Sequence, residues 1–579
     1  MGAYFGNIKT LEALKRGRIS SVIPSFRANS FKAPQNAFRG ARYAAVYEAI
    51  NALQETPWRI NKRVLDVVLA LRERGLEIAG LPEKYDPEIH GRPEDWKKES
   101  HSKYEEGMKH MMKNFECART LGVAQTYRRE ERFYFVHTLD FRGRAYPVTS
   151  YLSPQGKDLD RGLLTFAEEC GEPLGERGAI SLARHGANCW GNNKLPFEER
   201  IAWVEEHTPR IVRIGEDPLS DYWWEEAEEP FQFLAFCFEW AGYQREGIGY
   251  RCSLPISVDG CNNALQHFSA LLLDKELGEA TNMLPTSKPR DVYQEVCDLV
   301  NARIEQDAAQ GKEEALLLQG KITRKVVKTP VMTAYYGVKP QGMEEQIEEA
   351  FEEQGIKLGK GKMKAISYLV TLLREEIIPQ KTPSVKPCME LLKEVTRILA
   401  KNNQPTIWTT PSGFLVVQEY KDYPRTKVRT KLFGKMYCIK TQQETVEAKI
   451  NVREHTDGIS ANFIHSLDSA AMMLCTLEAK SKGVKAFRMI HDGFSTIPAH
   501  MDILNKAIRK SFREMYEKED LLKKFVLEAL DNPLLQTEPK KKRGRKKKVK
   551  TGEEVWVKFN IQKGTLKLHF LDEAEYFFA

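Results

Sequence analysis

The chain has 579 residues, with 42% hydrophobic residues, 10% aromatic residues and a formal net charge of +8. This length and composition indicate a folded protein with several structural units and exclude an intrinsically disordered chain. No run of about 18 apolar residues is present, so no transmembrane helix is expected. The ten cysteines form no CxxC pair. Their scatter excludes a zinc ribbon and favours a reduced, intracellular protein.

The first 42 residues form a basic segment, with eight Lys or Arg and a single acid, Glu12. This composition is typical of an organelle targeting peptide. Pro24 and Pro34 interrupt any amphipathic helix, however, so we favour a flexible basic arm over a targeting signal.

The next 100 residues combine helical and strand patterns. Apolar residues at three- and four-residue spacing predict two helices in 43–80, and a further helix is expected at 101–128 after a loop at 81–100. The segment "RFYFVHTLDFRGRAYPV" (132–148) predicts a strand with a turn at "RGR".

The remainder of the chain shows long helical patterns that alternate with short strand patterns. Helices are expected at 291–307, 311–336, 341–380, 385–402 and 460–482. Residues 406–454 predict β-hairpins, and residues 485–500 predict a strand, a turn and a strand. A basic run, "KKKRGRKKKVK" (540–550), carries nine Lys or Arg within a polar linker at 532–552. Removing these nine charges from the net charge of +8 leaves −1, so a polyanion site in the rest of the chain must be local.

Two acids stand where an apolar strand pattern meets glycine. Asp259 follows "LPISV" in "SVDGCNNALQHF" (257–268), and Asp492 lies in "MIHDGFSTI". If both strands belong to one sheet, the two carboxylates could share a pair of divalent ions, as two-metal phosphoryl transfer requires. Oxygen ligands favour magnesium. The alternative is that each acid is a solvated turn residue.

The segment "ITRKVVKTPVMTAYYGVK" (322–339) carries a regular basic pattern. On a helix, Arg324 and Lys328 lie on one face and suit a triphosphate. Tyr336, beside Gly337 at the helix end, would present a ring and a hydroxyl near a sugar or base. Pro330 predicts a kink. The alternative is an amphipathic helix with a solvated basic side.

Five segments occur in the order found in single-subunit DNA-dependent RNA polymerases of the bacteriophage and mitochondrial type. These segments are "DFRGRAYP", "SVDGCNNALQHFSALL", "TRKVVKTPVMTAYYG", "NFIHSLD" and "IHDGFSTIP". The chain resembles this family from about residue 43 to the end. Further segments, such as "SPQGKDLDRGLLTFA" and the terminal "FFA", resemble the phage members most.

The resemblance implies a mainly helical α+β fold of the right-hand type, with palm, fingers and thumb around a nucleic-acid cleft. It implies addition of NTPs to an RNA 3′-hydroxyl on a DNA template, release of pyrophosphate and a two-magnesium mechanism. The implied partners are template and promoter DNA, the RNA transcript and NTPs. The implied setting is transcription of phage genes in the cytoplasm of an infected bacterial cell.

The resemblance also implies roles for individual residues. Asp259, Asp492 and the carbonyl of Gly260 would hold two magnesium ions. Arg324 and Lys328 would bind the incoming triphosphate, and Lys328 would also protonate pyrophosphate.

Further roles concern the nucleotide and the RNA–DNA hybrid. Tyr336 would close the insertion site and sense the ribose 2′-hydroxyl, with His465 as its partner. Arg142 and Arg144 would contact the hybrid near the primer end, and His491 would give positional support.

Two more basic residues, Lys194 in "GNNKLPF" and Arg161 in "LDRGLL", resemble phosphate or template contacts. Ala264 stands five positions after Asp259, where related DNA polymerases place a glutamate that blocks the 2′-hydroxyl. The small alanine leaves room for a ribose and favours RNA synthesis.

Two basic segments are candidates for contacts with promoter DNA. The hairpin region 416–440 matches the loop with which phage enzymes read promoter bases, and Arg425, Arg429 and Lys431 could bond guanine edges. The alternative is an ordinary basic hairpin on phosphates. In the run 540–550, Arg543 and Arg545 resemble a minor-groove hook. A nuclear import signal or a tail that binds DNA without sequence preference would have the same composition.

The expected domains follow the family pattern. They are a basic arm or remnant of an N-terminal domain (1–42), a helical region with the thumb (43–128), the palm (129–290 and 466–579, the latter ending in a C-terminal foot) and the fingers (291–465).

Only about 42 residues precede the shared region, where phage enzymes carry a large N-terminal domain. The chain would then be a compact natural polymerase, half of a split enzyme that needs a partner chain, or an engineered or partial form. Alternative functions are a promoter-independent, primase-like polymerase and a DNA-binding subunit without activity of its own.

Overall fold

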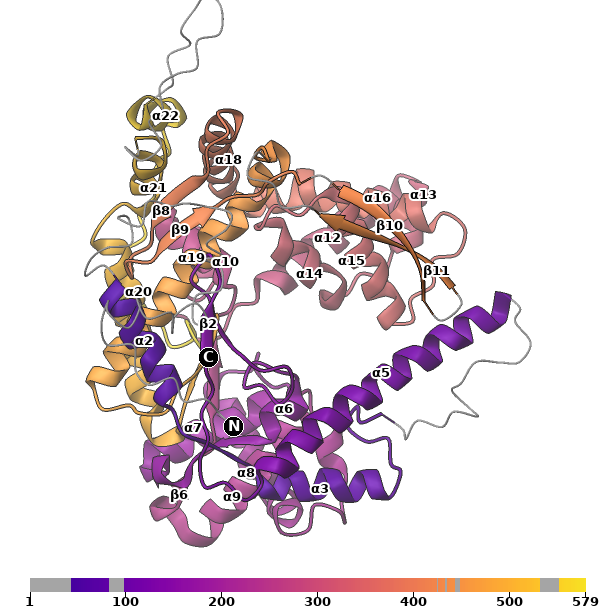
Figure 1. Ribbon diagram of the computed structural model, residues 1–579, viewed down its shortest axis with the longest axis vertical. Coiled ribbons are helices and arrows are strands. Elements are labelled where there is room, and N and C mark those ends of the chain that lie inside the picture. Colours follow the sequence, from indigo (N-terminus) through magenta and orange to yellow (C-terminus); the bar gives the residue numbers. More distant parts are fainter. Residues whose placement is uncertain (1–42, 83–97, 424, 433–434, 443–447, 532–550) are drawn as a thin grey trace, which may run out of the picture.

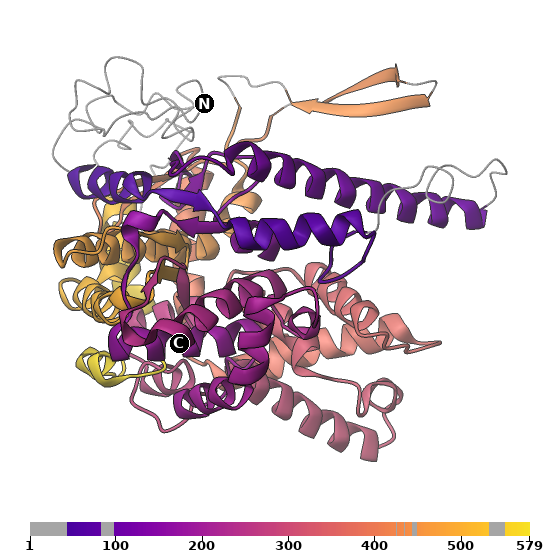
Figure 2. The ribbon, with the colours of Figure 1, turned by 90° about the horizontal axis from the view of Figure 1, so that it is seen from below.

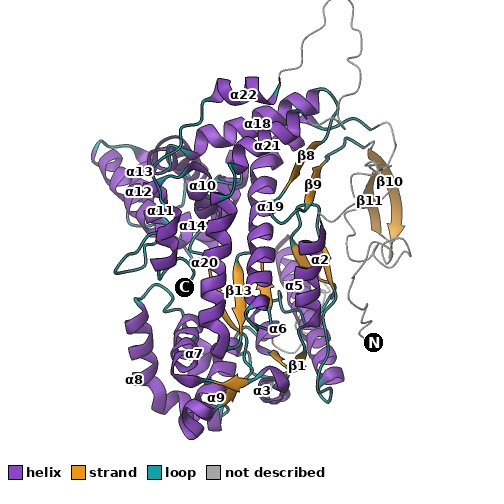
Figure 3. Ribbon diagram, turned by 90° about the vertical axis from the view of Figure 1, so that its left-hand side faces the viewer, coloured by secondary structure: helices purple, strands orange, loops and turns teal. Residues whose placement is uncertain are grey.

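The computed structural model describes residues 43–82, 98–423, 425–432, 435–442, 448–531 and 551–579. The predicted arm 1–42 and the basic run with Arg543 and Arg545 lie outside the described residues. The described chain has the expected mainly helical α+β character, with short strands between many helices (Figure 3). Within it, no helix is long and apolar enough to cross a membrane.

The N-terminal helices form where their patterns predict them. They are α2 (Ala44–Glu55), α3 (Lys62–Glu73) and α5 (Lys98–Tyr127), and the short strand β1 (Trp58–Ile60) separates the first two. The Asn61 side chain caps α3 by accepting a hydrogen bond from the Val64 N–H at 3.3 Å. The long helix α5 extends from the body on the same side as a β-hairpin described below (Figures 1 and 2).

The expected "RGR" turn joins two short antiparallel strands, β2 (His137–Leu139) and β3 (Ala145–Pro147). Gly143 lies in this turn with φ +95°, and a Cβ there would approach Ser469 Oγ to 3.0 Å. Only glycine therefore suits the position where this turn packs against the long helix α19 (Val452–Ser481).

A central three-stranded antiparallel sheet positions the candidate site. Its strand order is β12 (Arg488–Ile490), β13 (Gly493–Thr496) and β7 (Ile256–Asp259). Helices α7 (Gly175–Trp190) and α20 (Met501–Glu517) contact this sheet. Between β3 and β7 the chain also forms α6 (Asp158–Gly162), β4 (Leu164–Phe166), β5 (Glu172–Pro173), α8 (Phe197–Glu216), α9 (Pro230–Glu246) and β6 (Arg251–Cys252).

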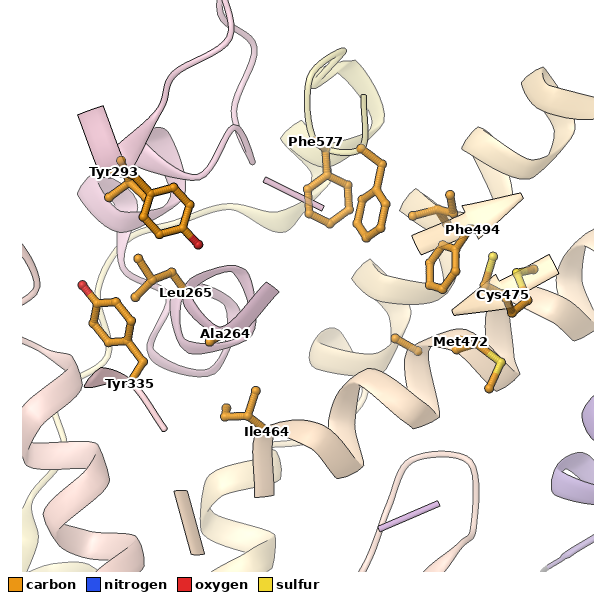
Figure 4. Packing of buried hydrophobic residues seen from close by; sticks show 14 of the residues in the cluster. Ala264, Leu265, Tyr293, Tyr335, Ile464, Met472, Cys475, Phe494 and Phe577 are labelled. Atoms are coloured by element: carbon orange, nitrogen blue, oxygen red, sulfur yellow. The ribbon is translucent and has the colours of Figure 1, made fainter. Parts of the chain in front are cut away.

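The core beside the sheet is aromatic and continues to the C-terminus. Phe494 of β13 stacks on Phe578, with ring centroids 5.3 Å apart. Figure 4 shows Phe494 and Phe577 in the same cluster as Met472 and Cys475 of α19. The chain end thus packs against the strands that carry the candidate acids. The helices α21 (Leu521–Leu530) and α22 (Gly552–Phe559) precede it.

Two of the predicted long helices are interrupted. The pattern at 311–336 forms α13 (Glu313–Leu318) and α14 (Arg324–Ala334), because Gly320 between them adopts φ +70°. The pattern at 341–380 forms α15 (Pro340–Glu353), α16 (Lys362–Thr371), a π-helical turn (Leu372–Ile377) and α17 (Ile378–Lys381). Gly355, Gly359 and Gly361 lie between α15 and α16. All three have positive φ, which interrupts the helical backbone there. Other helices here are α10 (Asn263–Leu272), α11 (Lys275–Ala280), α12 (Val292–Ala309) and α18 (Val385–Lys401).

The predicted hairpins in 406–454 are confirmed except at their C-terminal end. They are β8 (Thr406–Thr409) with β9 (Leu415–Gln418), and β10 (Arg425–Leu432) with β11 (Lys435–Gln442). Residues 452–454 were wrongly assigned to the hairpin region. They begin α19, because the Asn451 side chain accepts hydrogen bonds from the N–H groups of Arg453 and Glu454 and caps the helix.

Candidate active site

The sheet brings together the two acids that the sequence singled out. Asp259 is the last residue of β7, and Asp492 lies in the turn between β12 and β13. Gly493 pairs with Asp259 in the sheet register, and the Gly260 N–H donates to the Asp492 carbonyl at 3.3 Å. The two carboxylates are therefore neighbours although 232 residues separate them in the sequence.

Two glycines leave room for this arrangement. A Cβ on Gly493 would lie 2.4 Å from Asp259 Oδ1, and a Cβ on Gly260 would lie 2.7 Å from Gln266 Oε1. Both distances are shorter than real Cβ contacts, so a side chain at either position would force the Asp259 carboxylate or the Gln266 amide to move. The glycines beside the acids thus have a steric role.

The electrostatics of the two acids reflect their shared, recessed position. Both side chains reach solvent, yet protein surrounds them on most sides. This desolvation, followed by the charge of Asp492, raises the pKa of Asp259 to about 6. Desolvation also raises the pKa of Asp492. Such a pair of repelling oxygen donors fits a divalent cation.

The donor set suits magnesium. Among the described residues, no group of three or more His, Cys, Asp or Glu side chains could hold a metal. Magnesium commonly binds through one or two carboxylates and completes its shell with water and substrate phosphates. Asp259, Asp492 and the Gly260 carbonyl therefore suit a magnesium ion whose remaining ligands are water and the phosphates of a substrate.

A group of basic side chains lies around α14. Arg324 donates from Nε to Asp291 Oδ2 at 2.6 Å, and Asp291 also caps α12. Desolvation lowers the pKa of Lys328, and the positive charges of Arg324 and Lys194 lower it further. Neither Lys194 nor Lys328 forms an ion pair within the described part of the chain. The two lysines therefore carry positive charge that remains available to a polyphosphate.

The predicted partners Tyr336 and His465 are in ring contact, with centroids 4.8 Å apart. Arg142 Nη1 lies 2.8 Å from His465 Nδ1. A guanidinium only donates, so Nδ1 accepts and the imidazole is neutral. Desolvation and the charges of Arg144 and Arg142 lower the pKa of His465 to about 2, which agrees with a neutral ring.

The Tyr336 hydroxyl is protonated. Desolvation raises its pKa above the ordinary value, and the charges of Asp468 and Asp492 raise it further. Tyr336 is thus close enough to Asp492 to sense its charge. The phenol can therefore donate a hydrogen bond to a ligand that lies between the two acids and His465.

Arg142 and Arg144 are held by carboxylates of the protein. Arg142 Nε donates to Asp140 Oδ2 at 2.9 Å. Arg144 Nε donates to Asp468 Oδ1 at 3.2 Å, and Asn263 donates to the other Asp468 oxygen at 3.1 Å. The side chains of Arg144 and Asp468 are 13% and 2% exposed, so this ion pair ties the β2–β3 turn to α19 inside the protein.

Arg161 lies near the acids but is paired. It donates to Glu229 Oε1 at 2.6 Å, and its charge opposes the rise in the pKa of Asp259. His491 packs edge-on against Tyr146, with centroids 5.0 Å apart, and has a left-handed backbone with φ +50°. Its ring contact supports the turn that carries Asp492. Ala264 is buried on α10.

The candidate promoter-reading residues Arg425, Arg429 and Lys431 all lie on β10. Their backbone partners on β11 are Gln442, Cys438 and Met436.

One residue at the site, Arg488, was missed by sequence reasoning. It is 3% exposed and donates to Ser495 Oγ at 3.2 Å and to Ser257 Oγ. These bonds link all three strands of the central sheet, and the one to Ser257 reaches β7 two residues before Asp259. An arginine inside the apolar strand "KAFRMI" is the signal that could have revealed it.

Comparisons with known proteins identify the family of the chain. The sequence profile of the DNA-dependent RNA polymerase family matches residues 172–579. The DNA-directed RNA polymerase of Enterobacteria phage T3 is 33% identical over 540 residues, which cover 84% of this chain and 61% of the relative. T7 RNA polymerase of Escherichia phage T7 is 33% identical over 534 residues, 83% of this chain and 60% of the relative.

Organelle enzymes show the same level of similarity. The chloroplastic DNA-directed RNA polymerase 3 of Nicotiana sylvestris is 34% identical over 529 residues, 87% of this chain and 53% of the relative. The chain thus spans about three fifths of the length of the phage relatives and about half that of the plant relative. With a profile match over most of its length and adjacent acids on one sheet, the chain belongs to the DNA-dependent RNA polymerase family.

Proposed function

We propose that this chain adds NTPs to the 3′-hydroxyl of an RNA on a DNA template and releases pyrophosphate. The observation that supports this most is that Asp259 and Asp492 are adjacent on one sheet. The charge of Asp492 also acts on Tyr336, whose pKa it raises. The basic cluster of Lys194, Arg324 and Lys328 provides a complementary surface for a triphosphate.

Two magnesium ions, held by Asp259, Asp492 and the Gly260 carbonyl, would activate the attacking 3′-oxygen and neutralise charge on the transferring phosphoryl group. The protein's own side chains position the nucleotide. Lys194 and Arg324 bind the outer phosphates, and Lys328 donates a proton to the leaving pyrophosphate. The lowered pKa of Lys328 makes its ammonium a better acid, which supports this role.

Tyr336 and His465 select the ribose. The protonated Tyr336 hydroxyl and the neutral His465 ring give the sugar edge hydrogen-bonding groups. The small, buried Ala264 has no side chain long enough to block the 2′-position. A dNTP lacks the 2′-hydroxyl and would leave these polar groups without a hydrogen-bond partner. Unpaired polar groups cost binding free energy, so a dNTP binds less well than an NTP.

For the domains we propose the division that the resemblance implies. Residues 43–128 form the helical region with the thumb, 129–290 and 466–579 form the palm with the C-terminal foot, and 291–465 form the fingers. The contacts of Arg142, Arg144 and Arg161 with the hybrid and template would be made by side chains that Asp140, Asp468 and Glu229 already hold in place. Arg425, Arg429 and Lys431 contact promoter DNA, assisted by Arg543 and Arg545. The setting is transcription of phage genes in the cytoplasm of an infected bacterium.

Extension of a labelled RNA primer on a DNA template tests this function. NTPs and dNTPs are supplied in parallel with magnesium, on a primed template and on a promoter duplex. Template-dependent growth with NTPs and little with dNTPs is expected. Growth on the primed template alone favours a primase-like enzyme. No growth by the folded, monodisperse chain would contradict a self-sufficient polymerase and direct the search to a partner chain.

A further inference from the structure

Arg200, on the first turn of α8, is completely buried and carries its charge into the protein. Its Nε donates to the Leu195 carbonyl at 2.9 Å, and its Nη2 donates to the Asn193 carbonyl at 2.9 Å. Its Nη1 donates to Asn188 Oδ1 at 2.9 Å. The two carbonyls that it binds are those on either side of Lys194.

The guanidinium of Arg200 is satisfied by these neutral groups. Within the described residues it forms no ion pair with a carboxylate, and desolvation lowers its pKa to about 10. Burying a cation is unfavourable unless its donors are hydrogen-bonded. A planar guanidinium offers donors in a fixed fork and can bind two carbonyls at once, whereas a lysine ammonium is a point charge. The contact is thus specific to arginine.

The bound loop connects α7 to α8 and carries Lys194 at its exposed tip. Gly191 ends α7 with φ +116°, and the Leu195 N–H donates to the Asn192 carbonyl at 3.1 Å. Lys194 itself has no ion pair among the described residues, yet its charge acts on Lys328 and Cys261. The Lys194 charge therefore lies within electrostatic range of Lys328, on a loop whose backbone Arg200 holds.

We propose that Arg200 is a positioning residue that fixes Lys194 for the triphosphate of the incoming nucleotide. This inference rests on the proposed function. Arg200 contacts no substrate and acts through the two peptide carbonyls. Without it, Lys194 must be ordered each time a nucleotide binds, and the KM for NTP rises about tenfold, the equivalent of ordering roughly one residue.

The test compares Arg200→Met, Arg200→Lys, Lys194→Met and the double variant Arg200→Met/Lys194→Met in primer extension. Arg200→Met should raise KM for NTP about as much as Lys194→Met does, with a smaller change in kcat. If Arg200 acts only through Lys194, the effects of the two substitutions do not add. The double variant should then have the same KM for NTP as Lys194→Met. Arg200→Lys keeps the charge without the fork, so it should resemble Arg200→Met.

The chain provides a matched control. Arg184 stacks on the same ring as Arg200, with its guanidinium carbon 3.9 Å from the Phe197 centroid against 4.8 Å for Arg200. No hydrogen bond joins the Arg184 side chain to residues 191–196. Arg184→Met should therefore leave KM unchanged.

Amide hydrogen exchange of residues 191–195 gives a readout that does not require activity. Exchange should be faster in Arg200→Lys than in the wild type. Unchanged exchange, or Arg200→Met and Lys194→Met effects that multiply in the double variant, would overturn the inference. Wild-type extension in the same assay reports the proposed function separately. If Arg200→Met does not fold, KM for NTP is compared instead among Arg200→Lys, Lys194→Met and the double variant Arg200→Lys/Lys194→Met.

Discussion

The ion pair between Arg144 and Asp468 gives the sharpest stability prediction. Asp468→Asn keeps the shape of the side chain but removes its charge, and it leaves the Arg144 guanidinium, 13% exposed, without a counter-charge. Breaking a buried pair on one side costs about 3–5 kcal/mol, because the remaining charge stays desolvated. We expect the free energy of unfolding of the wild type to exceed that of Asp468→Asn by about this amount.

An exposed pair on the same molecule serves as the control. Asp66 and Arg128 approach to 2.6 Å with side chains 52% and 40% exposed. Asp66→Asn should cost only about 0–1 kcal/mol, since solvent screens such pairs. Urea unfolding followed by far-UV circular dichroism measures both variants. A cost below about 1 kcal/mol for Asp468→Asn would refute the reasoning, because the pair would then behave as a surface contact.

Three further predictions follow from the site and the core. In Gly493→Ala, the new Cβ would displace the Asp259 carboxylate, which lies 2.4 Å away. A displacement of about 1 Å at a reacting centre costs about 100-fold in rate. Primer extension within threefold of the wild type would contradict this, and Gly249→Ala, with no neighbour within 4 Å, is the control. Lys328→Gln removes a charged phosphate ligand and should raise KM for NTP about 10- to 100-fold. Lys325→Gln removes another exposed charge from the same helix and should not, and equal effects of the two variants would count against the assignment. Desolvation lowers the pKa of buried His137 to about 4, so only the unfolded chain takes up this proton as the pH falls below about 6.5. Stability is thus lost as the pH falls from 6.5 towards 4. His137→Gln should reduce the slope of unfolding free energy against pH by about 1.4 kcal/mol per unit between pH 6 and 5. Urea unfolding at several pH values measures this slope, and equal slopes in the two proteins would disprove the claim.

The sequence predicted the parts of the site whose signal is local. Asp259 and Asp492 each follow an apolar strand and precede glycine, and α14 carries Arg324 and Lys328 at helical spacing. These patterns depend on neighbouring residues alone, so they can be read without knowing the fold. The resemblance to a known family then related motifs that are distant in the chain.

The contacts that connect these parts could not be predicted from local patterns. Arg488 bonds serines on two other strands, and Arg144 pairs with Asp468, 324 residues further along the chain. Arg200 binds main-chain carbonyls, which leave no mark on residue identity.

The boundaries of the helices depended on backbone geometry in the same way. Gly320 separates two helices that the apolar periodicity joined, because its positive φ outweighs the pattern. Conversely, Asn451 begins α19 inside a segment that alternates like a strand. In both cases a single residue's backbone conformation or side-chain cap overrode a regional pattern.

Asp259 and Asp492 are proposed to form the catalytic centre of an RNA polymerase together. The most direct measurement is magnesium-dependent extension of an RNA primer on a DNA template by the wild type and by Asp492→Asn. Asp66→Asn serves as the control for a charge change elsewhere. We expect extension by the wild type and by Asp66→Asn, and none by Asp492→Asn at any magnesium concentration. Extension by Asp492→Asn within tenfold of the wild-type rate would contradict this proposal.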